Sequence, residues 1–177
     1  METIKQTAPA LFLTDYASYN EGIQFKHGHW VDLTQFNSAD EFSEYVTNHF
    51  EEVGIHDPEP MFTDFEGFPK QLYSESYSQT DLENLFFFFQ LDEYDQAKFA
   101  YFLDQGYKPA DAQNEYEDII LYEYNSEKDI WAIFEDYYPD AIKAEETCYY
   151  LEINYDSFKR DNFYEFEFNG QSYLVGA

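Results

Sequence analysis

Residues 163–175 read FYEFEFNGQSYLV, and this stretch decides the fold of the C-terminal part of the chain. Aromatic and acidic residues alternate over residues 163–168, which is the period of a strand with two different faces. The pair Asn169-Gly170 favours the positive φ angles of a type I′ turn. The sequence therefore predicts a β-hairpin that returns through residues 171–175.

Strand and helix signals alternate through the rest of the chain. Branched and aromatic residues predict strands at 10–14, 29–33 and 118–124. Helices are expected where Ser or Thr is followed three residues later by an acid. One such helix begins at Ser38 and ends at Gly54, a second begins at Thr80, and a third begins at Ser126 and is stopped by Pro139. Two further helices are expected, one over residues 93–105 and one from Pro109.

These signals predict an α+β fold made of three small subdomains. Repulsion among the many carboxylates favours an elongated arrangement of the chain. Pro58, Pro60, Gly67 and Pro69 interrupt regular structure in residues 55–69 and mark a boundary. The expected parts are an N-terminal α/β subdomain, a central helical subdomain and a C-terminal α/β subdomain with the terminal hairpin. Their bounds are residues 1–69, 70–112 and 113–177.

The charge of the chain excludes most nucleic-acid binders. Its 177 residues include 37 Asp and Glu against 9 Lys and Arg, a formal net charge of −28, whereas nucleic-acid binders neutralise phosphates with cationic groups. Aromatic residues make up 22%, too many for an acidic disordered tail. At one charge per about 1.7 Å of duplex axis, the chain carries the charge of roughly 48 Å of DNA. General solubility and a negatively charged recognition surface both fit this composition.

Cysteine content and hydropathy indicate a soluble cytoplasmic protein. Cys148 is the single cysteine and has no partner for an internal disulfide, which is typical of a reducing compartment. It lies in an apolar stretch, so we expect it to be buried and inert. Residues 1–20 do not resemble a signal peptide, and the apolar runs are too short to cross a bilayer.

No pattern in the sequence is specific for catalysis, for a cofactor or for a metal. His27 and His29 form the only close histidine pair, and without a third ligand an exposed pair is the simpler interpretation. Acid pairs such as Glu51 and Glu52 arise by chance among so many acids. Phosphate-binding glycine loops, serine elbows and calcium loops are missing from the sequence. The sequence does not argue for an enzyme.

Acidic residues instead interleave with aromatic ones, so that rings can face inward and carboxylates outward. A solvated helix face explains each such cluster by itself, but the recurrence favours a partner-binding surface. The candidate carboxylates for that surface are Asp92, Glu93, Asp95, Glu115, Glu117, Asp118, Glu123, Glu135 and Asp136.

Three short motifs follow one another along the chain. The first is residues 16–22 (YASYNEG) followed by 28–30 (GHW), the second is 64–69 (DFEGFP), and the third is 155–161 (YDSFKRD). Together they resemble the motifs of ArdA-type antirestriction proteins. Glu152 and Asn154 depart from the usual family pattern. The residues that carry the resemblance are Tyr19, Asn20, Gly22, Asp64, Glu66, Gly67, Tyr155, Arg160 and Asp161.

The resemblance implies a dimer that imitates bent B-form DNA. Such a protein occupies the DNA-binding groove of a type I restriction-modification enzyme, at its methyltransferase core, and protects incoming mobile DNA. It needs no cofactor and binds neither nucleic acid nor membrane. Two other functions stay open on the residues alone: a small hydrolase that uses a pair of carboxylates, and a structural or charge-buffering protein.

The dimer contact is expected within residues 140–156, through Tyr149, Leu151 and Ile153, because this stretch has more apolar area than one strand needs. In the competing interpretation these three side chains fill the protein's own core as one face of a buried strand. Arg160 is expected to be structural, held by carboxylates on both sides.

Overall fold

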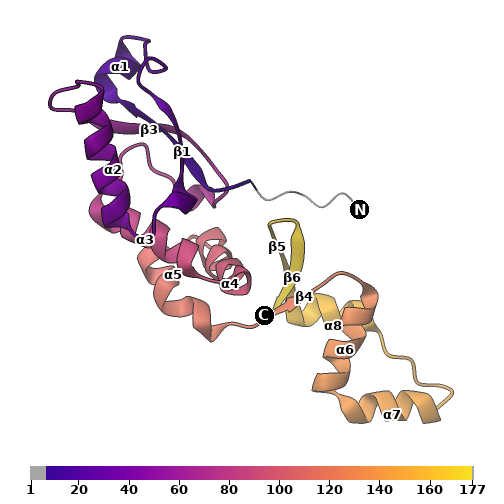
Figure 1. Ribbon diagram of the computed structural model, residues 1–177. Coiled ribbons are helices and arrows are strands. Elements are labelled where there is room, and N and C mark those ends of the chain that lie inside the picture. Colours follow the sequence, from indigo (N-terminus) through magenta and orange to yellow (C-terminus); the bar gives the residue numbers. More distant parts are fainter. Residues whose placement is uncertain (1–6, 177) are drawn as a thin grey trace. The chain divides into compact units, whose positions relative to one another are not determined.

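The computed structural model describes residues 7–176 (Figure 1). These residues form eight α-helices and two three-stranded antiparallel sheets, which confirms the predicted α+β class. The chain divides into two compact units, Met1–Asn114 and Glu115–Ala177. This boundary lies close to the one expected after residue 112, whereas residue 69 lies inside the first unit.

The sheet of the first unit has β1 (Ala10–Asp15) at its centre, between β2 (His29–Asp32) and β3 (Pro60–Glu66). β1 and β2 confirm two predicted strands, and all six residues of β1 are buried. The prediction that residues 55–69 interrupt regular structure is wrong, because β3 lies there. β3 is an edge strand with its proline at the first position, where a missing N–H breaks no ladder.

The helix α2 (Ala39–Glu52) begins and ends where the sequence predicts. The hydroxyl of Ser38 accepts a hydrogen bond from the Glu41 N–H at 3.2 Å. The Glu41 carboxylate accepts from the Asn37 N–H at 2.7 Å instead of turning to Ser38, so only half of a capping box forms. Gly54, at φ +74°, follows the helix in the left-handed conformation.

The middle of the chain is helical, as expected, and belongs to the first unit. The prediction that Thr80 begins a helix is wrong by two residues, because Ser78 and Asp81 have the same spacing and form the capping box. The remaining elements of this unit are α1 (Tyr16–Asn20), η1 (Leu33–Gln35), η2 (Lys70–Leu72), α3 (Gln79–Gln90), α4 (Glu93–Asp104) and α5 (Pro109–Glu115).

Aromatic side chains join the middle helices to the first sheet in one core. The ring of Phe42 on α2 lies 5.8 Å from that of Phe62 on β3 and 6.0 Å from that of Phe86 on α3, measured between centroids. Phe88 on α3 contacts Phe99 on α4 at 5.7 Å in the same way. Residues on both sides of position 69 therefore bury their side chains together.

The second unit contains the predicted hairpin. β5 (Phe163–Phe168) pairs with β6 (Gln171–Gly176), and Asn169 and Gly170 have φ angles of +50° and +78°. β6 lies between β5 and β4 (Leu121–Glu123). The strand predicted over 118–124 is therefore shorter, and Asp118 belongs to a preceding 3₁₀ turn, η3 (Tyr116–Asp118).

The second unit contains three helices, and the sequence predicted one of them. α6 (Glu127–Tyr137) begins after Ser126 as expected. Pro139 stops α6 but also begins α7 (Pro139–Thr147), since proline suits the first turn of a helix. α8 (Tyr155–Asn162), which carries the third motif, was not predicted. The core of this unit consists of Ile130, Ile133, Phe134, Phe158, Phe163 and Leu174.

Lys159 on α8 holds the structural position that the sequence analysis gave to Arg160. Its ammonium group forms an ion pair with Glu165 and lies 4.0 Å from the centroid of the Tyr124 ring. Desolvation opposes the charge of Lys159, but the hydrogen bonds to Glu165 and Tyr124 outweigh it and raise the Lys159 pKa. Lys159 therefore links α8 to β5 as a cation.

The prediction for Arg160 is wrong. Its side chain is 71% exposed and pairs with one carboxylate, that of Asp161, at 2.8 Å. α8 places neighbouring residues about 100° apart around its axis, so only one of two consecutive cations can turn toward the sheet. Lys159 takes that direction.

Replacing Lys159 with alanine should lower the stability of the protein by about 1 kcal/mol, because the change removes a cation–π contact, an ion pair and a packed aliphatic stem. Arg160→Ala, on the same helix with the same change in charge, should leave the melting temperature unchanged. Thermal unfolding followed by circular dichroism makes the comparison. Equal melting temperatures for the two variants would contradict the assignment.

Gly67→Ala should also destabilise the protein, since a Cβ there would lie 2.5 Å from the Thr7 carbonyl oxygen and 2.7 Å from the Pro9 Cα. Gly22→Ala is the matched control, because Gly22 has a similar positive φ but nothing within 4 Å of its Cβ position. The control should lose about 1 kcal/mol from backbone strain alone, and Gly67→Ala clearly more. Urea unfolding measures both, and a loss no larger at Gly67 would refute the close approach.

Candidate partner-binding surface

The described part of the chain exposes nearly all of its carboxylates. Within residues 7–176, Asp15 is buried, Asp32, Asp95, Asp129 and Glu145 are half-buried, and every other acid is exposed. The described residues contain four ion pairs, formed by Lys98, Lys143, Lys159 and Arg160. Most of the surface acids therefore have no cation beside them.

Acids also lie where helix geometry disfavours them. A helix C-terminus carries partial negative charge, and Lys or Arg is the favoured residue in the last turn. Among the α-helices in residues 7–176, only α8 has a Lys or Arg in its last turn. The last turns of α2, α4, α5, α6 and α7 contain Glu51, Glu52, Asp104, Glu115, Glu135, Asp136, Glu145 and Glu146.

The three candidate carboxylates in the first unit cluster at the start of α4. Asp92 caps the helix, accepting a hydrogen bond from the Asp95 N–H at 2.9 Å. The Asp95 carboxylate is 32% exposed and pairs with Lys98 at 3.0 Å. Glu93 is exposed. The N-terminus of α4 stabilises these acids, so a structural role explains Asp92 and Asp95 as well as a binding role does.

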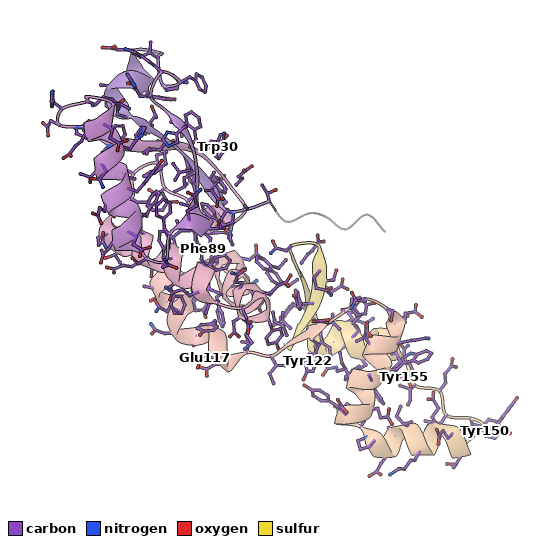
Figure 2. The ribbon with its side chains drawn as sticks, viewed as in Figure 1. Trp30, Phe89, Glu117, Tyr122, Tyr150 and Tyr155 are labelled. Carbon is purple, nitrogen blue, oxygen red and sulfur yellow. The ribbon has the colours of Figure 1, made fainter. Side chains whose placement is uncertain are left out.

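The other six candidates lie in the second unit, and all are exposed. Glu115, Glu117 and Asp118 cover the end of α5 and the η3 turn; Figure 2 labels Glu117. Glu117 accepts a hydrogen bond from the hydroxyl of Tyr116 at 3.1 Å. Glu123 ends β4, and Glu135 and Asp136 lie in the last turn of α6.

The first two motifs meet at the sheet of the first unit. Tyr19 on α1 and Asp64 on β3 line one cavity of about 320 Å³, together with Trp30 on β2. Asn20 ends α1, and Gly22 follows it at φ +73°. Glu66 ends β3 and Gly67 lies against Pro9, so these motif residues shape the backbone around the strands.

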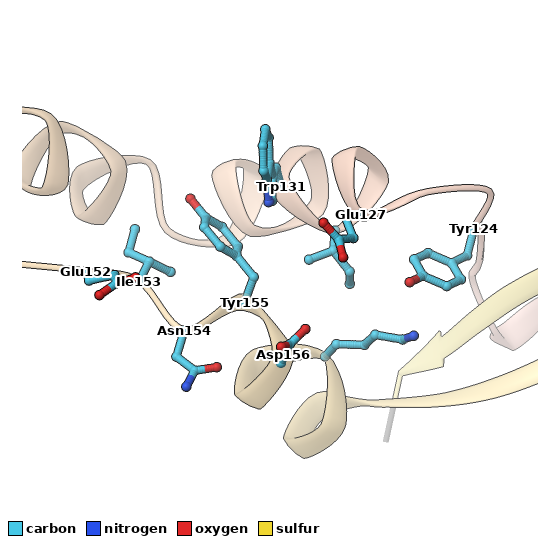
Figure 3. A pocket seen from close by; sticks show the side chains of 10 residues that line it. Tyr124, Glu127, Trp131, Glu152, Ile153, Asn154, Tyr155 and Asp156 are labelled. Atoms are coloured by element: carbon cyan, nitrogen blue, oxygen red, sulfur yellow. The ribbon is translucent and has the colours of Figure 1, made fainter.

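The third motif borders a cavity of about 560 Å³ in the second unit. In Figure 3, Glu127 and Trp131 come from α6, and Asn154, Tyr155 and Asp156 come from the start of α8 and the residue before it. The lining residues are Tyr124, Glu127, Ile130, Trp131, Glu152, Ile153, Asn154, Tyr155, Asp156 and Lys159. Arg160 and Asp161 are exposed and do not line this cavity.

Glu145 on α7 fixes one wall of this cavity. Its carboxylate accepts hydrogen bonds from the Ile153 N–H at 2.7 Å and from the Tyr155 hydroxyl at 3.3 Å. Partial burial and the charge of Glu145 raise the pKa of Tyr155, which therefore stays protonated and donates to the carboxylate. The Tyr155 ring packs 5.4 Å from that of Phe134, between centroids.

The residues expected at a dimer contact differ in their surroundings. Tyr149 is 95% exposed, Tyr150 is 92% exposed and Leu151 is 43% exposed, whereas Ile153 packs against the core of its own unit. Figure 2 shows Tyr150 on the segment that follows α7. The competing interpretation, a buried strand, is wrong because this segment has no strand partner among the described residues.

Two further expectations need correction. Cys148 is exposed, because the chain leaves α7 at this residue without entering a core. His27 and His29 are half-buried and not an exposed pair; the His29 ring lies 4.5 Å from that of His49, and its Nε2 lies 2.6 Å from the Tyr45 hydroxyl. Burial and the neighbouring His49 lower the pKa of His29. No group of three metal-ligating side chains converges among the described residues.

Sequence reasoning missed the 560 Å³ cavity and its wall residues Trp131, Glu127 and Asp156. Ile130, Ile133 and Phe134 form the buried face of α6, and Trp131 is turned about 100° from Ile130. A helical projection of residues 127–137 shows this position of Trp131 beside the buried face, so the sequence contains the information.

The family model described as Antirestriction protein (ArdA) matches residues 11–175, nearly the whole chain. The chain has no significant match among curated proteins or among solved structures. None of the helices in residues 7–176 is long and apolar enough to cross a bilayer. Given the extent of the family match, the chain belongs to the ArdA family of antirestriction proteins.

Proposed function

We propose that this protein is a DNA mimic that occupies the DNA-binding groove of a type I restriction-modification enzyme, at its methyltransferase core. It acts in the cytoplasm, without catalysis, and blocks the enzyme by binding. The observation that carries the proposal is the set of acids in the last turns of five helices, with so few cations beside them.

Carboxylates can replace phosphates in a groove built for DNA. Arg and Lys side chains form charge-assisted hydrogen bonds with both groups. Binding releases the counterions that the acidic surface collects, as it does for DNA itself. Individual exposed pairs contribute at most about 1 kcal/mol, so affinity needs many carboxylates acting together.

General solubility does not explain where the acids lie. Negative charge improves solubility from any exposed position, including helix N-termini, where it also stabilises the fold. Acids at helix C-termini oppose the helix dipole by a few tenths of a kcal/mol each. Residues that break a local rule without a structural gain are expected at functional surfaces.

A homodimer is part of the proposal. Tyr149 and Tyr150 are almost fully exposed beside Leu151, and a symmetric contact with a second copy is the commonest way to cover such side chains. Two chains double the charge of −28 and match roughly 95 Å of duplex, at one charge per about 1.7 Å.

Neutralising the acids should weaken inhibition while the fold becomes slightly more stable. The test variant replaces Glu115, Glu117, Glu123 and Glu135 with Gln and Asp136 with Asn. Its inhibition of a type I enzyme should fall at least tenfold, because five exposed charges are lost. Its melting temperature should stay equal or rise, because three of these acids oppose helix dipoles.

The single variant Asp95→Asn is the control, since this carboxylate is already paired with Lys98. It should inhibit like the unchanged protein. Full inhibition by the fivefold variant would contradict the proposal, and so would complete loss from one of its single changes, which points to a catalytic or otherwise unique residue.

The dimer should depend on the exposed segment after α7. Replacing Tyr149, Tyr150 and Leu151 together with serine removes the apolar side chains and should shift the protein from dimer to monomer at micromolar concentration. Tyr164→Ser, which changes an exposed ring on β5, is the control and should leave the dimer intact. Light scattering reads both masses; a monomeric unchanged protein with full inhibitory activity would exclude this part of the proposal.

A further inference from the structure

The 560 Å³ cavity beside α6 contains an aromatic side chain that the core does not need. Trp131 is 49% exposed, while Ile130 and Phe134 on the same helix are buried. The indole ring lies 5.8 Å from the Tyr155 ring, between centroids, and both rings line the cavity. An indole that faces a cavity and solvent offers its π face to a cation.

Three uncompensated carboxylates surround these rings. Glu127, Glu152 and Asp156 line the same cavity, and all three are exposed. Figure 3 shows Glu127 on α6 and Asp156 at the start of α8. Within the described residues, none of the three makes a side-chain hydrogen bond or an ion pair, unlike Glu145 beside them. The cavity therefore combines an aromatic wall with unmatched negative charge.

At one end of the cavity, a cation of the protein itself, the Lys159 side chain, is already bound between a ring and a carboxylate. The Lys159 ammonium group lies over the Tyr124 ring and pairs with Glu165. Since Glu165 matches the charge of Lys159, the charges of Glu127, Glu152 and Asp156 are left for a ligand. The other end, at Trp131 and Tyr155, repeats the combination of ring and carboxylate without an internal cation.

We propose that this cavity binds an arginine side chain of the protein's partner, with the guanidinium stacked on Trp131 and its charge matched by the carboxylates of Glu127, Glu152 and Asp156 that line the cavity. Arginine suits the site better than lysine, because a planar guanidinium can stack on a ring and donate several hydrogen bonds to carboxylates at once. A cavity of this size accepts a whole side chain. The inference rests on the proposed function, in which the arginine belongs to the DNA-binding groove of the enzyme.

The two tryptophans of the chain allow the cavity to be observed directly. In the variant Trp30→Phe, Trp131 is the only tryptophan, so its fluorescence reports on this cavity alone. The variant is titrated with a tetra-arginine peptide and with a tetra-lysine peptide at about 0.15 M salt, where surface attraction is screened beyond about 8 Å. Tetra-arginine should change the emission to saturation, with a dissociation constant at least about threefold lower than that of tetra-lysine.

A charge-matched pair of variants separates the cavity from the rest of the acidic surface. In the Trp30→Phe background, Glu127→Gln, Glu152→Gln and Asp156→Asn together should weaken tetra-arginine binding about tenfold. Glu44→Gln, Glu59→Gln and Glu83→Gln change the charge equally in the first unit, where all three acids are exposed and none lies in the last turn of a helix. This control should lose less than about twofold.

Three results would overturn the inference: equal affinity for the two peptides, an equal loss in both triple variants, or an emission that responds to protein concentration and not to peptide. The last result would assign the cavity to a second copy of the chain. The proposed function is judged separately, because a protein that inhibits the enzyme without binding tetra-arginine at Trp131 retains that function and refutes only the arginine site.

Discussion

Aromatic packing is the interaction on which the rest of this structure depends, because it holds together a chain whose carboxylates repel one another. Two carboxylates about 7 Å apart in water repel by roughly 0.6 kcal/mol before screening. One buried Phe side chain contributes about 2 kcal/mol or more. Eleven phenylalanines of the described residues are buried, and their rings contact one another in both units, as between Phe42 and Phe62 and between Phe134 and Phe158.

This packing frees the surface from any structural need for cations. A fold stabilised by ion pairs would place Lys and Arg beside its acids, whereas here the cores supply the stability. Lys159 is the informative exception, since its charge is used inside the second unit, between Tyr124 and Glu165. The acids at helix C-termini, except the half-buried Glu145, then present negative charge outward, which the proposed substitution for phosphates requires.

Turn and helix-capping residues predicted those elements of the fold whose position depends on a few neighbouring residues. The hairpin at Asn169-Gly170 and the start of α2 at Ser38 follow from backbone conformations that these residues favour. β3 escaped prediction because Pro60 at its first position and Pro58 and Pro69 on either side of it resemble a break until the edge position of the strand is known. The structural role of Lys159, and not of its neighbour Arg160, depends on which side of α8 faces the sheet, and the sequence analysis expected no helix at these residues.

The candidate surface was predictable in composition but not in detail. Counting acids identified a negatively charged protein, and the three motifs identified the family. Composition does not reveal which acids lie at helix ends, because that depends on where each helix begins and ends. It also does not reveal that Trp131 borders a cavity with Glu127 and Asp156, because that depends on which way each helix is turned about its axis. Diffuse charge and the proposed cation site therefore share a surface that the sequence describes only as acidic.

Competition with DNA tests the central claim most directly. The protein is bound to the methyltransferase core of a type I enzyme, and a duplex containing the enzyme's recognition sequence is added at several salt concentrations. If carboxylates occupy the phosphate sites, the duplex displaces the protein completely, and the logarithm of the protein's binding constant falls linearly with the logarithm of the salt concentration. A complex that holds protein and duplex together, or an affinity that salt does not change, would contradict the account.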